Sequence, residues 1–269
     1  MSRIQKKFEE LKSKKQKALI AYIMAGYPEE KYTELIIKSM IKGGADIIEI
    51  GFPFTDPLAD GPIIQNASTV SLSNGIILNR ILKLVKKMRK ETDIPFVLMT
   101  YTNILYNRGY YKFVRDVKNA GFDGLILPDM TPEESKDYVS AAKKYDVDTI
   151  FLISPNTKNN RIKKILEITS GFLYLVAVYG TTGSRDKIKR YSVNFLKRVK
   201  NLTANRMPIG IGFGISRPED VKKYVRSGAD AVIVGSAFLK LVEKTPKSKL
   251  EEKIIKFTKN LKDETAYLH

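Results

Sequence analysis

The stretch ADIIEIG, residues 45–51, is a short isoleucine-rich run, and it indicates the fold class. Similar apolar runs recur along the chain and alternate with longer, amphipathic, lysine-rich segments. Near-continuous apolar strands are typical of sheets that helices cover on both faces. The pattern therefore predicts consecutive βα units.

Eight runs are expected strands, and the amphipathic segments between them are expected helices. Eight βα units in about 250 residues predict a closed (β/α)8 TIM barrel, with an extra N-terminal helix over about Ser2 to Lys14 and a short helix after strand 8. No linker interrupts the rhythm, so residues 1–269 are expected to form a single barrel domain. The expected strands are Ala18–Met24, Ala45–Ile50, Pro95–Thr100, Gly124–Leu127, Asp148–Ile153, Phe172–Val178, Pro208–Gly212 and Ala229–Val234. The expected helices begin near Glu30, Ile76, Tyr110, Pro132, Asn160, Val193, Pro218 and Lys247.

The composition limits the function classes. The chain has no cysteine, so disulfides and thiolate metal sites are excluded. The polar start lacks the core of a signal peptide, and no apolar run approaches the roughly 20 residues of a membrane span, so a cytoplasmic location is expected. The formal charge of +18 leaves nucleic-acid binding open. The spread of lysines over most helical segments instead favours a solvated basic exterior that would attract an anionic substrate.

Glu49 is the first candidate for chemistry. Strand alternation places it on the same face as Ala45 and Ile47, at the carboxyl end of the second strand. A glutamate inside a barrel mouth has apolar surroundings that raise its pKa toward neutrality, as proton transfer at pH 7 requires. A strand-end glutamate bonded to a neighbouring loop is the alternative. Asp60 lies in the proline-rich loop that follows, and Asp60-Gly61 also fits an ordinary turn.

Glycine-rich segments follow the last three expected strands. Gly212-Phe213-Gly214-Ile215-Ser216 follows the seventh strand, and Gly235-Ser236 opens a short helix after the eighth. Backbone N–H groups at a helix start, with no side chain in the way at glycine, form an anion site. In (β/α)8 barrels this is a common place for a phosphate. The small, polar loop 179–186 after the sixth strand is expected to act as a lid.

The chain resembles the tryptophan synthase α subunit family from about Lys17 to Leu241. The most specific match is EIGFPFTDPLADGPIIQNA at residues 49–67. Further matches are MTYTNILYNRG at 99–109, LPDMTPEES at 127–135, YGTTGSR at 179–185, IGFGIS at 211–216 and VGSAF at 234–238. Two departures are Val178, where bacterial relatives often have arginine, and Thr55, where serine is commoner.

The resemblance implies retro-aldol cleavage of indole-3-glycerol phosphate to indole and glyceraldehyde 3-phosphate. Glu49 and Asp60 would be the catalytic carboxylates, and Tyr174 could steady them, although a core tyrosine is the alternative. Gly183 would join the phosphate cradle, and Thr182 would bond Asp60 when the lid closes. Residues expected to shape the indole slot, each of which could also be core, are Tyr22, Met99, Tyr101, Ile126, Leu152 and Phe213.

The resemblance also implies a partner, a pyridoxal-phosphate β subunit in an αββα complex. The segments that carry Pro53, Asp56 and Asn103 would face it. No cofactor is expected in this chain itself. None of the eight expected strands contains lysine, which disfavours a Schiff base. The only histidine is His269, so a histidine-rich zinc site is excluded and no metal is expected.

Two rival enzyme classes and one non-catalytic role stay open. Another phosphate-binding barrel, such as a phosphosugar isomerase, would share the glycine-rich segments. An indole-glycerol-phosphate synthase would need an inward lysine, which the expected strands lack. A barrel that serves mainly as an allosteric partner would not need the Glu49 and Asp60 pair.

Overall fold

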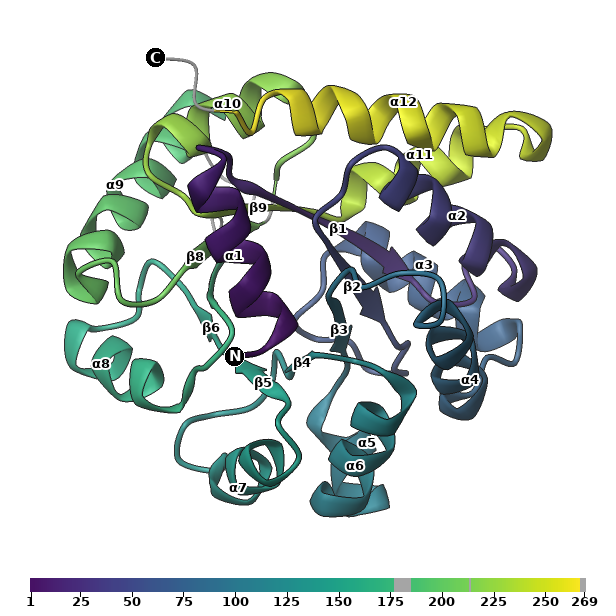
Figure 1. Ribbon diagram of the computed structural model, residues 1–269, viewed down its shortest axis with the longest axis horizontal. Coiled ribbons are helices and arrows are strands. Elements are labelled where there is room, and N and C mark those ends of the chain that lie inside the picture. Colours follow the sequence, from purple (N-terminus) through teal and green to yellow (C-terminus); the bar gives the residue numbers. More distant parts are fainter. Residues whose placement is uncertain (177–184, 213, 267–269) are drawn as a thin grey trace.

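The computed structural model describes residues 1–176, 185–212 and 214–266. Its strands form one sheet in which every paired neighbour is parallel, in the order β5-β4-β3-β2-β1-β9-β8-β7-β6. Helices surround this sheet (Figure 1). The strands are β1 (Ala18–Met24), β2 (Ile47–Gly51), β3 (Phe96–Met99), β4 (Gly124–Ile126), β5 (Asp148–Ile150), β6 (Leu152–Ile153), β7 (Leu173–Val176), β8 (Ile209–Gly212) and β9 (Ala231–Val234).

The fifth expected strand is divided into β5 and β6 at Phe151. β5 pairs with β4, and β6 pairs with β7, so the two ends of the sheet order are consecutive in the chain. The Phe151 carbonyl accepts a hydrogen bond from the Tyr174 N–H at 3.0 Å. This segment closes the ring, and the predicted (β/α)8 barrel is confirmed.

The helices form the outer ring, apart from α1, which lies across one end of the barrel (Figure 1). α1 begins after Ser2, whose side chain accepts a hydrogen bond from the Gln5 N–H in a capping box. The bounds are α1 (Arg3–Ser13), α2 (Glu30–Lys42), α3 (Pro62–Ser73), α4 (Leu78–Met88), α5 (Thr102–Arg108), α6 (Tyr110–Ala120), α7 (Lys136–Lys144), α8 (Asn159–Ile168), α9 (Arg185–Thr203), α10 (Pro218–Arg226), α11 (Ser236–Lys244), the 3-10 helix η1 (Lys247–Lys249) and α12 (Leu250–Asp263).

Four details differ from the sequence predictions. α3 and α5 were not expected, because α3 is rich in serine and β-branched residues and α5 has only seven residues. The predicted start near Pro132 is wrong: residues 132–134 form turns, and the helix begins at Lys136. The start near Val193 is also wrong, since α9 begins at Arg185, in a charged segment without apolar periodicity.

Three aspartates, of which Asp46 and Asp123 are buried and Asp230 is half-buried, share one arrangement at the amino ends of the strands. Each accepts a hydrogen bond from a backbone N–H of a neighbouring strand and forms an ion pair with at least one Lys or Arg. The backbone N–H thus has a hydrogen-bond acceptor, and the carboxylate has a cation to balance its charge. The groups are Asp46 with Leu19 and Lys262, Asp123 with Phe96, Arg89 and Arg3, and Asp230 with Ile209, Lys17 and Lys200.

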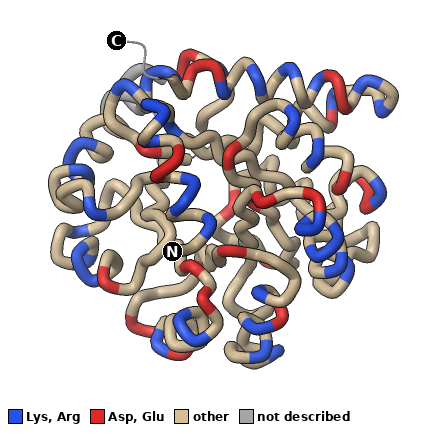
Figure 2. Tube along the Cα trace, in the orientation of Figure 1, with Lys and Arg blue, Asp and Glu red and all other residues tan. Residues whose placement is uncertain are grey.

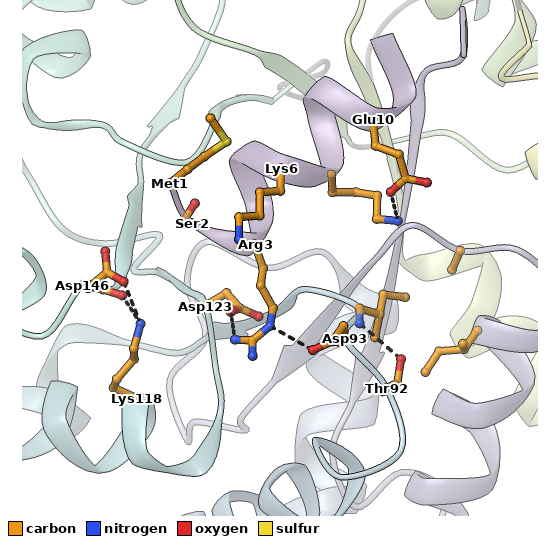
Figure 3. A pocket seen from close by; sticks show the side chains of 14 residues that line it. Met1, Ser2, Arg3, Lys6, Glu10, Thr92, Asp93, Lys118, Asp123 and Asp146 are labelled. Carbon is orange, nitrogen blue, oxygen red and sulfur yellow. Dashed lines mark hydrogen bonds and ion pairs between the residues drawn. The ribbon is translucent and has the colours of Figure 1, made fainter. Parts of the chain in front are cut away.

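α1 closes over this amino end through polar contacts. Arg3 reaches Asp123 at 3.1 Å and Asp93 at 3.4 Å, as Figure 3 shows. Lys118 forms a further ion pair with Asp146 at 3.1 Å in the same pocket. The pocket has a volume of about 770 Å³. The two ion pairs of Arg3 therefore attach α1 to the barrel.

The remaining charges lie mainly on the helices. Figure 2 shows Lys and Arg distributed around the outer ring instead of along one edge. Within the described ranges, no helix is both long enough and apolar enough to span a membrane.

We predict that Asp123→Ala lowers the free energy of unfolding by about 3–5 kcal/mol, because it leaves the Arg89 charge and the Phe96 N–H without their partner. Urea unfolding checks this value. Asp93→Ala is the matched control: Asp93 is 93% exposed, and the loss of such a pair should cost at most about 1 kcal/mol. Equal losses in the two variants would contradict the prediction.

Candidate active site

Glu49 lies near the carboxyl end of β2, where its Cα pairs in register with Tyr22 of β1 and Val97 of β3. Its side chain is only 1% exposed. Within the described part of the chain, Glu49 Oε2 is buried and has no hydrogen-bond partner. A buried polar atom without a partner is rare and costly, so its presence points to a function or a ligand.

Asp60 lies in the loop between β2 and α3, and α3 anchors this loop. The Ser68 hydroxyl accepts a hydrogen bond from the Phe54 N–H at 3.1 Å and donates one to the Phe54 carbonyl at 3.0 Å. The Gln65 side-chain amide donates to the Asp60 carbonyl at 2.9 Å. The helix that the sequence prediction missed thus holds the second carboxyl in place.

Tyr101, at the end of the segment after β3, orients the Asp60 side chain. Its hydroxyl donates to Asp60 Oδ2 at 3.1 Å and accepts from the Ala59 N–H at 3.1 Å. The Tyr101 ring stacks on Phe54 with centroids 5.0 Å apart. The other oxygen, Asp60 Oδ1, is buried and has no hydrogen-bond partner among the described residues.

Burial changes the acidity of both carboxyls. It raises the pKa of Glu49 to about 8, and the neighbouring Asp60 charge adds to the increase. Burial also raises the pKa of Asp60 to about 6, although the Tyr101 hydrogen bond opposes this rise. At pH 7 Glu49 therefore mainly holds its proton, whereas Asp60 is mainly ionised. A pair separated in this way provides one acid and one anion.

Two glycines make room for the buried tyrosines beside Glu49. A Cβ on Gly51 would collide with the Tyr22 hydroxyl, and a Cβ on Gly212 would lie 2.5 Å from the Tyr174 hydroxyl. Both tyrosines are almost fully buried, at 3% and 6% exposed. Glycine at these strand ends is thus required by close approach, not by backbone conformation.

A cavity of about 270 Å³ opens at the carboxyl ends of the strands and contains both carboxyls. Nine of the sixteen residues predicted to be catalytic or to bind substrate line this cavity. Those that line the cavity are Tyr22, Glu49, Asp60, Met99, Tyr174, Gly214, Ile215, Gly235 and Ser236. Thr182, Gly183 and Phe213, together with the departure at Val178, lie outside the described residues.

Four predicted site residues are absent from the lining. Tyr101 bonds Asp60, and Gly212 packs against the Tyr174 hydroxyl. Ile126 pairs with Met99 in the sheet, and Leu152 pairs with Tyr174. The structure thus places all four beside residues that do line the cavity.

Ser216, the last residue of the predicted glycine-rich segment, also lines the cavity, and the sequence analysis missed five lining residues: Ile63, Ile64, Ile233, Ala237 and Lys240. Ile63 and Ile64 belong to α3, which was not predicted. Strand alternation before Gly235 could have identified Ile233. Lys240 lies four residues after Ser236, on the same face of α11.

The anion end of the cavity is formed by the start of α11. Gly235 is the N-cap of this nine-residue helix, and no side chain caps it. The first N–H groups of a helix have no partner within the helix and carry a partial positive charge. Gly214, which also lines the cavity, has a φ of +74°, which favours glycine. This end can accept an anionic group such as a phosphate.

The residues predicted to face a partner follow β2 and β3, at the carboxyl ends of the strands. Asp56 and Asn103 are exposed, whereas Pro53 is buried. Leu58, which the sequence analysis did not single out, is 92% exposed. In the described ranges no group of three or more Asp, Glu, His or Cys side chains could hold a metal ion.

A (β/α)8 barrel with two buried carboxyls of raised pKa beside an uncapped helix start is typical of barrel enzymes that transfer protons on anionic substrates. The comparisons with known proteins identify the family within this class. The family model described as tryptophan synthase alpha chain matches residues 8–266. The chain belongs to this family, whose members are lyases of tryptophan biosynthesis.

Individual relatives support the same family assignment. The tryptophan synthase alpha chain of Methanosarcina barkeri is 46% identical over 241 residues, which cover 90% of this chain and 89% of the relative. The crystal structure of tryptophan synthase subunit alpha from Legionella pneumophila has a TM-score of 0.89 and 31% identity, with 98% of each chain covered. The tryptophan synthase complex from Pyrococcus furiosus has a TM-score of 0.83 and 33% identity, with 92% of this chain and 98% of that chain covered.

We predict that Glu49→Gln stabilises the fold more at pH 8 than at pH 5. The Glu49 carboxyl ordinarily titrates near 4.5 but near 8 when folded, so between these values the unfolded chain binds fewer protons. The wild type therefore loses stability as pH rises through this window, by up to about 1.4 kcal/mol per pKa unit, whereas glutamine does not titrate.

Urea midpoints of wild type and Glu49→Gln at the two pH values test this prediction. Glu252→Gln, an exposed change on α12, is the control and should alter both midpoints equally. A Glu49→Gln effect that does not depend on pH would show that Glu49 titrates normally in the folded protein.

Proposed function

We propose that this chain cleaves indole-3-glycerol phosphate to indole and glyceraldehyde 3-phosphate, with Glu49 as general acid and base and Asp60 as charge-stabilising group. The observation that carries the proposal is the buried, unpartnered Glu49 Oε2 in the same cavity as Asp60. The raised pKa of Glu49 near 8 supports a proton donor at neutral pH.

The reaction begins when Glu49 donates its proton to C3 of the indole ring. The positive charge that develops on the ring is shared with the ring nitrogen, whose N–H donates to the ionised Asp60 carboxylate. The bond between C3 and the hydroxyl-bearing glycerol carbon then breaks, and its electron pair restores the aromatic ring. The hydroxyl proton passes to Glu49 as the aldehyde forms, so Glu49 regains its proton and the atoms balance.

The apolar part of the cavity fits a flat ring, and its other end fits the phosphate. Met99 and Tyr22 contribute walls of the proposed indole slot. Next to the lining, Tyr101 bonds Asp60, Ile126 pairs with Met99 and Leu152 pairs with Tyr174. Tyr174 would steady the carboxyl pair. We propose that the phosphate binds at Gly212, Gly214, Ile215, Gly235 and Ser236, with Thr182, Gly183 and Phe213 completing the site.

We predict that Glu49→Gln and Asp60→Asn each lower the rate of indole release from indole-3-glycerol phosphate at least about a hundredfold, because each removes a positioned proton-transfer or charge-stabilising group. Single-turnover and steady-state indole assays measure the rate. Glu9→Gln and Asp93→Asn are matched controls, since both residues are exposed and Asp93 lies at the opposite end of the barrel. Near-normal rates in both site variants would contradict the mechanism.

The second part of the proposal is a partner: a tryptophan synthase β subunit that holds pyridoxal phosphate, in an αββα heterotetramer. The relative from Pyrococcus furiosus, solved as a complex, supports a partner. The exposed Asp56, Leu58 and Asn103 would provide the contact segments. We also infer that this chain binds no cofactor of its own, forms one barrel domain and acts in the cytoplasm.

We predict that Asp56→Lys weakens binding of the β subunit at least about tenfold, because it reverses an exposed charge at the proposed contact. Calorimetric titration with the β subunit measures the Kd, and the ratio of indole release with and without the partner measures stimulation. Glu252→Lys makes the same charge change on α12 and should leave both values unaltered. Identical Kd values for the two variants would remove Asp56 from the interface.

A further inference from the structure

We infer that Lys240 is the cation that binds the phosphate of the substrate and sets the preference of this site for phosphorylated ligands. The inference rests on the proposed function, because it adds a residue to the anion end of the same cavity. Lys240 is the only basic side chain among the described residues that line this cavity.

The position of Lys240 on α11 brings its charge toward the helix start. It follows Ser236 by four residues, about one helical turn of 5.4 Å, so both side chains lie on the same face. Side chains of an α-helix lean toward the N-terminus, which directs the Lys240 stem back along the first turn. The ammonium group can therefore reach the level of the uncapped N–H groups that follow Gly235.

The Lys240 ammonium is available for a ligand. No described residue forms an ion pair, a hydrogen bond or a cation–π contact with it, and its side chain is exposed. In the same cavity, Glu49 is 1% exposed and keeps one oxygen without a partner among the described residues. The cavity thus contains both an unsatisfied acid and an unpaired cation, which fits a ligand with an anionic tail.

Charge balance supports the same role. A phosphate ester carries about −1.5 to −2 charges at pH 7 and would enter a cavity in which Asp60 is already mainly ionised. Backbone N–H groups supply only partial charges, equivalent to about half an elementary charge at a helix start. Lys240 adds a full positive charge at the mouth, so it offsets the repulsion and favours a phosphorylated substrate over its unphosphorylated counterpart.

The test compares Lys240→Gln with Lys244→Gln, which removes an exposed lysine one turn further along α11 and outside the cavity. Isothermal titration with inorganic phosphate and with glycerol 3-phosphate measures binding without relying on catalysis. We expect Lys240→Gln to bind both ligands about fivefold more weakly, and Lys244→Gln to bind like wild type. Lys240→Arg should restore most of the affinity, since it retains the charge.

Kinetics provide a second readout. Lys240→Gln should raise KM for indole-3-glycerol phosphate by a similar factor with little change in kcat, because binding to the phosphate is equal in the ground and transition states. Unchanged phosphate affinity in Lys240→Gln, or an equal loss in Lys244→Gln, would overturn the inference and leave the proposed function intact. Absence of indole release by wild type would overturn the proposed function, and the titrations would still decide the role of Lys240.

Discussion

Carboxyl groups buried in this barrel lose the hydration that keeps them ionised in water, and the chain compensates for that loss at only one end. At the amino ends of the strands, Asp123 and Asp230 are paired with Arg and Lys side chains and with backbone N–H groups. At the carboxyl ends, Glu49 and Asp60 each keep one oxygen with no hydrogen-bond partner among the described residues. The first arrangement stabilises the barrel, whereas the second raises two pKa values toward neutrality.

This asymmetry explains how one fold separates stability from chemistry. At the amino end Asp123 and Asp230 are paired with cations, Asp148 accepts hydrogen bonds from Ser2 and Ser170, and α1 is held there by Arg3 and Ser2. The two carboxyls at the carboxyl end lower the free energy of unfolding at neutral pH, because an unpaired buried carboxyl favours the protonated form. As a result, at pH 7 Glu49 mainly keeps a proton that it can donate, while Asp60 is mainly ionised beside it. Acid–base chemistry therefore requires no residue type beyond two carboxyls in different surroundings.

The substrate end of the site depends on a different element. α11 presents its uncapped start to the cavity, and Lys240 lies one turn further along the same helix. A single short helix thus offers both backbone donors and a full charge. Between β2, which carries Glu49, and β9, which precedes α11, lies β1, and its Tyr22 lines the cavity together with Ile233 of β9. The carboxyl pair suits proton transfer and the start of α11 suits anion binding, which are the two requirements of the proposed substrate.

Structural features that depend only on adjacent residues could be predicted from the sequence. The period-2 alternation of residues 45–50 was enough to place Glu49 inside the barrel, and eight apolar runs were enough for the (β/α)8 fold. Asp60 was not distinguishable from a turn residue without the family motif, because its surroundings come from Tyr101, 41 residues away, and from α3, whose serine-rich sequence hides the helix. Lys240 resembled every other surface lysine until α11 was packed against the cavity. Local periodicity is encoded in adjacent residues, but burial, pKa and charge balance arise only when distant segments meet, so those properties were decided by the tertiary structure alone.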